Sequence, residues 1–414
     1  MAKVAVLGHG VVGSGIVEVL SFNADSIEKR AGEKIEVKYV VDVREFPALP
    51  YADKFVKDFT IVENDPEVTV VAESIGGIGV AYDFVKRCLL KGKSVVTSNK
   101  ELVAKKGAEL LKIAKEKNVN FFFEASVGGG IPIIRPLHKC LAGNKIDLIA
   151  GILNGTTNYI LTKMITENQS FDTALKKAQQ LGYAEQNPSA DVDGFDTCRK
   201  ICILSSLAYG KHVYPDYVKT TGITNVSLSD VAFAEDYNSV IKLIGYSSQD
   251  ENGKINIEVI PALINKECQL SHVDDVYNGI LVRGNAIGDA VFYGKGAGKL
   301  PTASAVVGDI IEAVKADEME KSLWWDDSSE EESKNMFSNI NNFLCDYYIS
   351  FKGEFTNEKI KEIVCGKEVV VLKSKDKNPC ENGIIIKNTT LCEVEELFNK
   401  ARVNFDNIFK CFNF

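Results

Sequence analysis

The first twenty residues, MAKVAVLGHGVVGSGIVEVL (1–20), carry the strongest architectural signal in the chain. A short apolar run ends at glycines 8, 10 and 13, and a helical pattern follows at once. The predicted order is therefore a strand, a tight turn and a helix. Between a strand and a helix, such glycines allow the chain to turn, the backbone to approach a pyrophosphate and the helix to pack on the strand. The alternative is an ordinary glycine-rich turn. The flanking strand and helix favour a dinucleotide-binding unit with phosphates at the helix N-terminus.

The next apolar segment, KIEVKYVVDV (34–43), places a carboxylate at its end. Asp42 could accept a hydrogen bond from a ribose 2′-hydroxyl, whereas Arg44 could bind a 2′-phosphate, so the choice between NAD and NADP stays open. Two further strand-like runs, at 68–74 and 92–100, end in small polar residues. The carboxyl ends of parallel strands face the ligand, which makes this edge of the sheet a nucleotide crevice.

A second informative segment, LGYAEQNPSADVDGFDTCRK (181–200), is an acidic loop that turns helical near Gly194. Asp196 and Lys200 then lie one helical turn apart. A solvated pair of this kind stabilises a helix by only about 0.3 to 0.5 kcal/mol. Two interpretations remain: a solvated first turn, or a cleft in which the carboxylate holds a polar substrate while the lysine moves protons.

Composition excludes several classes of protein. A length of 414 residues predicts about two or three domains. The net charge of -9 argues against nucleic-acid binding. Ten cysteines without C-x-x-C spacing fit a reducing compartment, and four histidines without zinc-ligand spacing argue against a catalytic zinc. Because no apolar run approaches twenty residues, we expect a cytoplasmic protein with no membrane partner.

Six segments, in this order along the chain, resemble the homoserine dehydrogenase family. They are GHGVVG (8–13), VVTSNKELVA (95–104), FFEASVGGGIPII (122–134), GILNGTTNYIL (151–161), the 181–200 segment and GKGAGKLPTASAVVGDI (294–310). The resemblance implies an α/β fold with an NAD(P)-binding Rossmann domain over 1–135, on which 300–320 packs back. It also implies an α+β catalytic and dimerisation domain over 136–325, and hence a homodimer.

The family's activity is the reversible NAD(P)-dependent oxidation of L-homoserine to L-aspartate 4-semialdehyde, a step toward threonine and methionine. By resemblance, Lys200 is the acid/base group and Lys100 lies beside the reacting oxygen and the cofactor. The substrate-binding positions are Glu185, Asp191 and Asp196. The cofactor-binding positions are Gly8, Gly10, Val11, Val12, Gly13, Asp42, Arg44, Thr97, Lys100, Gly182 and Gly298. The family's sodium ion corresponds to Glu124 and the backbone carbonyls of Val127, Gly129 and Ile131.

The residues from about 340 to 414 predict strand, helix, two strands, helix and strand, which is a ferredoxin-like order. This order resembles an ACT domain, a small amino-acid-sensing module. The usual Pro-Gly turn before its first helix is missing from FKGEFTNEKI (351–360). Feedback by an amino acid such as threonine and a purely dimerising or vestigial role both remain open. For the whole chain, the alternative to an enzyme is a catalytically silent sensor of nucleotide and amino acid, although every matched catalytic position is filled.

Overall fold

The computed structural model describes residues 1–315, 323, 325–326, 330–373 and 380–414. The chain divides into two compact units, one containing residues 1–146, 202–216 and 294–333 and the other the remaining residues. Within the described residues, no helix combines the length and the apolar character needed to cross a membrane.

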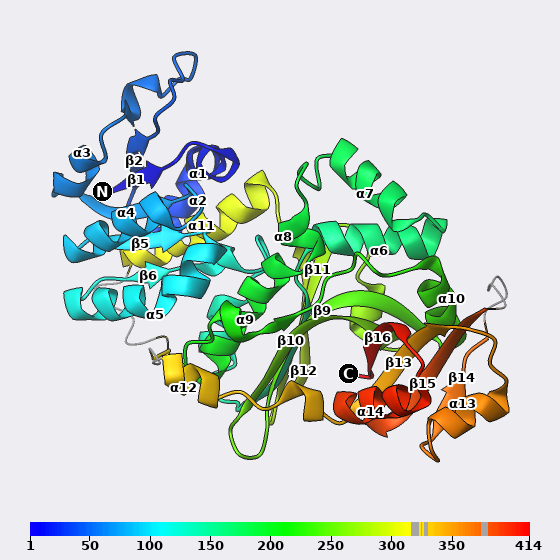
Figure 1. Cartoon of the computed structure of the whole chain (residues 1–414). Coiled ribbons are helices and arrows are strands. Elements are labelled where there is room, and N and C mark those ends of the chain that lie inside the picture. Colours follow the sequence, from blue (N-terminus) through cyan, green and yellow to red (C-terminus); the bar gives the residue numbers. More distant parts are fainter. Residues whose placement is uncertain (316–322, 324, 327–329, 374–379) are drawn as a thin grey trace. The chain divides into compact units, whose positions relative to one another are not determined.

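Among its described residues, the first unit contains a six-stranded sheet (Figure 1). Its order is β3-β2-β1-β4-β5-β6, and neighbouring strands pair in parallel throughout. The strands are β1 Ala2–Leu7, β2 Ile35–Val41, β3 Phe55–Val56, β4 Val68–Glu73, β5 Ser94–Thr97 and β6 Phe121–Phe122. This is the doubly wound order of dinucleotide-binding domains, so the fold predicted from the glycine loop is confirmed.

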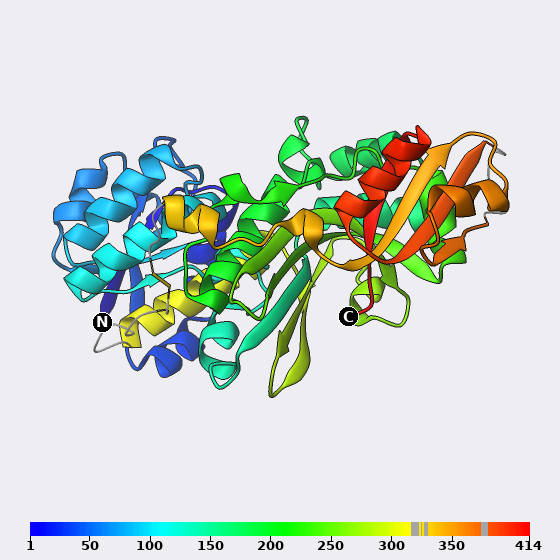
Figure 2. The same cartoon turned by 60° about the horizontal axis from the view of Figure 1, so that its bottom comes forward.

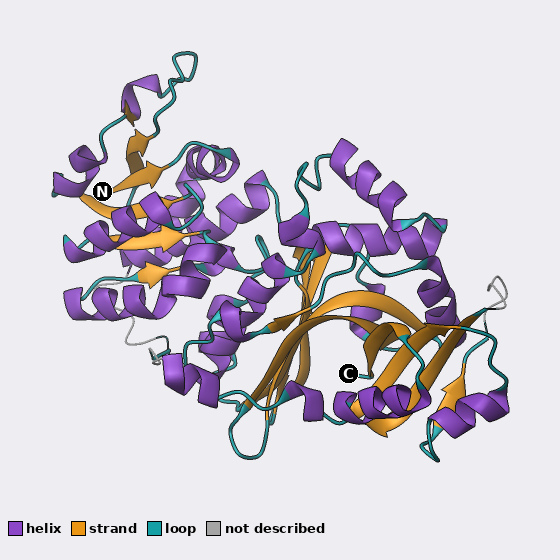
Figure 3. Ribbon diagram, in the orientation of Figure 1, coloured by secondary structure: helices purple, strands orange, loops and turns teal. Residues whose placement is uncertain are grey.

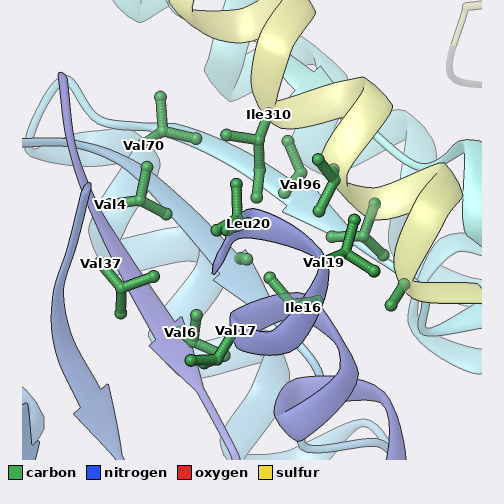
Figure 4. Packing of buried hydrophobic residues seen from close by; sticks show 14 of the residues in the cluster. Val4, Val6, Ile16, Val17, Val19, Leu20, Val37, Val70, Val96 and Ile310 are labelled. Carbon is green, nitrogen blue, oxygen red and sulfur yellow. The ribbon is translucent and has the colours of Figure 1, made fainter. Parts of the chain in front are cut away.

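Helices cover both faces of this sheet (Figure 2). They are α1 Val11–Phe22, α2 Ala24–Ala31, α3 Phe59–Asn64, α4 Gly79–Leu90, α5 Lys100–Lys117 and α11 Lys299–Lys315, with a π-helical turn at Pro136–Cys140. The core on one face joins β1, α1 and α11 (Figure 4). Val4 and Val6 alternate along β1, and Ile16 and Leu20 lie one turn apart on α1. Helix α11 therefore returns to the sheet; residues 316–320 of the predicted returning segment lie outside the described residues.

The second unit contains a ten-stranded mixed sheet within the described residues, in the order β12-β11-β7-β9-β10-β16-β13-β15-β14, with β8 paired to β10. Its strands are β7 Ile146–Ile152, β8 Lys219–Thr220, β9 Ser239–Gln249, β10 Ile255–Asn265, β11 Tyr277–Gly284, β12 Gly288–Lys295, β13 Cys345–Lys352, β14 Val369–Val371, β15 Glu381–Thr389 and β16 Phe405–Phe412. The remaining helices are α6 Gly155–Glu167, α7 Phe171–Gln180, α8 Ser189–Val192, α9 Phe195–Tyr209, α10 Leu228–Asp236, α12 Glu330–Asn335, α13 Asn357–Ile363 and α14 Leu391–Ala401.

The C-terminal part of this unit has the predicted order β13-α13-β14-β15-α14-β16, and its strands are arranged β16-β13-β15-β14 (Figure 3). This arrangement is ferredoxin-like. Its two helices share an apolar core with one face of the strands. The other face contacts α10, where Phe233 lies against Gly383 and the Tyr348 hydroxyl donates to Asp230. Strand β16 also pairs in parallel with β10, so the sheet runs unbroken through the whole unit.

Candidate active site

The turn between β1 and α1 depends on its glycines. Gly8 has φ +89°, in the left-handed region that favours glycine. A Cβ on Gly13 would lie 1.9 Å from the carbonyl oxygen of Gly8, so no other residue fits there. Gly10 precedes the first helical residues, Val11 and Val12, and places the N-terminus of α1 at the turn. The strand, tight glycine turn and helix predicted for this segment are therefore present, and phosphate binding at the helix N-terminus stays a prediction.

Asp42 follows β2 and is saturated with hydrogen bonds. Its Oδ2 accepts from the backbone amide of His9 at 2.7 Å and from Arg44 Nη2 at 2.9 Å. Its Oδ1 accepts from the backbone amide and Nε of Arg44 at 2.9 and 3.0 Å. These bonds, those from the guanidinium first, hold the pKa of Asp42 well below its usual range. The two residues that the sequence offered as alternatives form one ion pair.

The predicted residues Thr97 and Lys100 lie at the end of β5 and the start of α5. Thr97 is fully buried, and its hydroxyl contacts Glu73 on the neighbouring strand. Asn99 caps α5 by accepting from the amide of Leu102, so Lys100 is the first helical residue. Gly298, with φ +124°, immediately precedes α11 in the same unit.

In the second unit, Lys200 is buried on α9 and contacts two oxygen atoms. Its Nζ lies 2.7 Å from Asp196 Oδ2 and 2.7 Å from the carbonyl oxygen of Leu153. The side chains of Lys200 and Asp196 are only 9% and 3% exposed. A solvated first turn is thus the wrong interpretation of this pair. Burial strengthens the attraction between the charges and makes either charge costly without the other.

Asn154 joins the two carboxylates that the sequence singled out. Its Nδ2 donates to Asp191 Oδ1 at 2.7 Å and to Asp196 Oδ2 at 2.9 Å. Its Oδ1 accepts from the amide of Thr157 and caps α6. Asn154 lies in the 151–161 segment but was not among the predicted site residues. Asn followed by a helical run is an N-cap signal, and that signal alone could have drawn attention to it.

Glu185 and Gly182 lie in the loop after α7. Gly182 has φ +75°, and Glu185 is exposed. Among the described residues, no hydrogen bond joins the Glu185 carboxylate to Asp191, Asp196 or Lys200. The structure therefore brings Asp191, Asp196 and Lys200 together through Asn154, and leaves the Glu185 carboxylate open to solvent.

The predicted cation loop follows β6. The Glu124 carboxylate accepts from the backbone amides of Ile133, Ile134 and Arg135 at 2.6 to 2.8 Å, and its Oε2 also accepts from Arg135 Nε at 3.3 Å. The other three predicted ligands, Val127, Gly129 and Ile131, are buried. Nowhere in the described ranges does a donor reach their carbonyl oxygens. Buried carbonyls normally have a partner, and an all-oxygen set suits a hard cation.

Known proteins match most of the chain. Residues 132–311 match the family model of homoserine dehydrogenase, and residues 8–124 match that of the homoserine dehydrogenase NAD-binding domain. The homoserine dehydrogenase of Synechocystis sp. is 42% identical over 321 residues, which are 75% of this chain and 73% of that protein.

Solved structures extend the match. A homoserine dehydrogenase from Thiobacillus denitrificans has a TM-score of 0.88 and 33% identity, covering 100% of this chain and 98% of its own. A hyperthermophilic archaeal homoserine dehydrogenase, solved in complex with NADPH, has a TM-score of 0.65 and 29% identity, covering 75% of this chain and 97% of its own. With the nucleotide-binding sheet and the buried lysine and carboxylates already described, these likenesses show that the chain belongs to the homoserine dehydrogenase family of oxidoreductases.

Proposed function

We propose that the chain interconverts L-homoserine and L-aspartate 4-semialdehyde with NADP, and that Lys200 is the acid/base group. The observation that carries this proposal is the buried contact of Lys200 with Asp196 and the Leu153 carbonyl. As an ammonium, Lys200 donates a proton to the carbonyl oxygen of the semialdehyde. As an amine, it accepts the hydroxyl proton of homoserine in the reverse direction. When bound, the nicotinamide supplies or accepts the hydride.

The amino-acid part of the substrate needs an anchor for its ammonium group. Asp191 and Asp196 both accept a hydrogen bond from Asn154 Nδ2, which holds the two carboxylates close to each other. Their negative charge suits an ammonium, bound directly or through water. Glu185, the third of the predicted substrate-binding carboxylates, is exposed. Lys100, at the start of α5, stabilises the negative charge that develops on the reacting oxygen.

The contacts of Asp42 favour NADP over NAD. Each of its oxygens already accepts two hydrogen bonds, which is the capacity of a carboxylate oxygen. A ribose 2′-hydroxyl would therefore have to displace a protein donor. Arg44 is 59% exposed and presents the positive charge that a 2′-phosphate requires. The other cofactor positions, Gly8 to Gly13, Thr97, Gly182 and Gly298, do not discriminate between the two nucleotides.

The direct test is the absorbance of reduced nicotinamide when purified protein meets L-homoserine, measured separately with NAD and with NADP. We expect growth of the signal with both nucleotides and a lower KM for NADP. No growth with either nucleotide, together with demonstrated nucleotide binding, would favour the silent sensor instead.

We propose that Glu124, Val127, Gly129 and Ile131 hold a sodium ion with a structural role through their backbone carbonyl oxygens, because the Glu124 carboxylate already accepts from four donors. The buried carbonyl oxygens in this loop support the assignment, because a cation would satisfy them. Sodium chloride should then raise the unfolding temperature above that in choline chloride at equal ionic strength. Equal unfolding temperatures in the two salts would count against the site.

The finer organisation follows the family. We assign residues 1–135 to the nucleotide domain, 136–325 to a catalytic and dimerisation domain and 340–414 to an ACT-like domain, in a cytoplasmic enzyme of threonine and methionine synthesis. A homodimer is supported by β12, an edge strand of its sheet, on which Val291 is 39% exposed and Tyr293 is 57% exposed. Light scattering that reports a monomer would contradict it. If added threonine leaves the turnover rate unchanged, the ACT-like domain has a structural role and not a regulatory one.

A further inference from the structure

Glu73 is a fully buried carboxylate at the carboxyl end of β4, and it accepts hydrogen bonds in two directions. Its Oε1 accepts from the backbone amides of Ile75 and Gly76 at 2.8 and 3.1 Å. Its Oε2 accepts from the hydroxyl of Thr97 at 2.5 Å. Glu73 and Thr97 are also direct partners in the β4–β5 ladder. One side chain therefore links the loop after β4 to the end of β5.

This carboxylate is costly to bury. Glu73 has no exposed surface, and burial raises its pKa against the opposing effect of its hydrogen bonds. Taking a carboxylate out of water carries a penalty of several kcal/mol, which an apolar side chain would avoid. A contribution to stability therefore does not account for an acidic residue at this point of a parallel sheet.

The hydrogen bonds continue from Thr97 to the start of α5. The Thr97 hydroxyl oxygen accepts from the amide of Asn99 at 2.9 Å. The Asn99 side chain donates to the carbonyl of Gly77 at 2.6 Å and accepts from the amide of Leu102 at 3.1 Å. Lys100 follows Asn99 directly. The loop after β4 and the first turn of α5 thus form a single hydrogen-bonded assembly.

We propose that Glu73 is a positioning residue, which fixes the Gly76–Gly77 loop and Lys100 in one arrangement through Thr97 and Asn99. The two glycines have φ +84° and +68°, in the left-handed region that favours glycine. Both segments lie at the carboxyl ends of parallel strands, where this fold binds its nucleotide. The inference rests on the proposed function for the role of Lys100.

Two single variants and their combination test the proposal. Glu73→Gln keeps the size of the side chain but replaces one of its two acceptor oxygens with an NH2 donor, which cannot accept the hydrogen bonds that both oxygens receive in the wild type. Thr97→Val removes the hydroxyl at nearly constant volume. For each we expect an about tenfold weaker affinity for NADPH, measured by nicotinamide fluorescence, because a hydrogen bond to a charged group is lost. We expect kcat to fall about 10- to 100-fold, as for a small misplacement of a catalytic group, with the KM for homoserine unchanged.

The double variant separates positioning from general damage. If Glu73 acts through Thr97, the double variant is no worse than Thr97→Val alone, since both remove one contact. Val70→Ala, in the core of the same strand, is the matched control: it lowers the unfolding temperature and leaves the NADPH affinity unchanged. The proposal would be overturned if the losses of NADPH affinity in the two single variants added up in the double variant. It would also be overturned if the variants lowered only the unfolding temperature. Because NADPH binding needs no turnover, failure of the proposed reaction would be recognised separately, by an inactive wild type.

Discussion

Asp196 Oδ2 lies 2.7 Å from Lys200 Nζ, across one turn of α9, with both side chains almost completely buried. The same oxygen accepts from Asn154 Nδ2, so one carboxylate oxygen receives an ammonium and an amide donor. A lysine held in this way has a fixed position and a fixed partner for its charge. Both properties suit a group that delivers a proton to one atom of a substrate.

Lys200→Ala should reduce kcat by about two to four orders of magnitude, the usual loss when an acid/base group is removed. Affinity for NADPH should be retained, because the glycine loop and Asp42 belong to the other compact unit. Turnover and nucleotide fluorescence titration measure the two effects. Because removal of one partner also leaves Asp196 buried without its cation, an unfolding curve is needed to show that the variant is folded. Near-normal turnover would transfer the proton role to another residue.

Asn154→Ala should raise the KM for homoserine about tenfold, because Asp191 and Asp196 lose the amide that holds them together. It should also cost about 1 kcal/mol of stability through the lost N-cap of α6. Ser170→Ala is the matched control, since Ser170 caps α7 in the same manner. It should lose only the stability of a helix cap, about 1 kcal/mol, with an unchanged KM. Equal KM values in the two variants would assign Asn154 a capping role only.

Arg44→Ser should raise the KM for NADP about 10- to 100-fold, because the charge opposite the 2′-phosphate is lost. The KM for NAD should fall, since Asp42 is released from its ion pair and can accept from a ribose hydroxyl. The matched control is Lys57→Ala, which removes another exposed cation of this unit whose partner is Glu45. A parallel change in both KM values would show that Arg44 does not discriminate between the nucleotides.

Sequence patterns predicted those elements whose conformation is determined by their own residues. The glycine loop predicted β1 and α1 because its conformation is set by Gly8 and Gly13 themselves. The order of elements predicted the ferredoxin-like topology, since alternating apolar patterns report each strand and helix separately. The parallel pairing of β16 with β10 was not predictable, because no local pattern reports which strand of a distant segment becomes a neighbour.

The site shows the same division. The spacing of Asp196 and Lys200 predicted their contact, but burial of the pair depends on elements elsewhere in the unit. Asn154 lies 37 residues before Asp191, and no pattern in either segment predicts the hydrogen bond between their side chains. Glu73 looked like an ordinary strand residue, because its partner Thr97 arrives from the next strand of the sheet.

Lys410 and Glu258 form a buried ion pair between β16 and β10, with side chains only 2% and 3% exposed. Lys410→Met should therefore cost about 3 to 5 kcal/mol, because Glu258 is left buried without its cation. Urea unfolding measures the loss. The double variant Lys410→Met, Glu258→Leu should recover most of it, since two apolar side chains replace a desolvated pair at small net cost. If the C-terminal segment is instead a loosely attached module, Lys410→Met will leave the main unfolding transition unchanged. If the whole urea transition shifts to lower urea concentration, β16 unfolds together with the rest of the ten-stranded sheet.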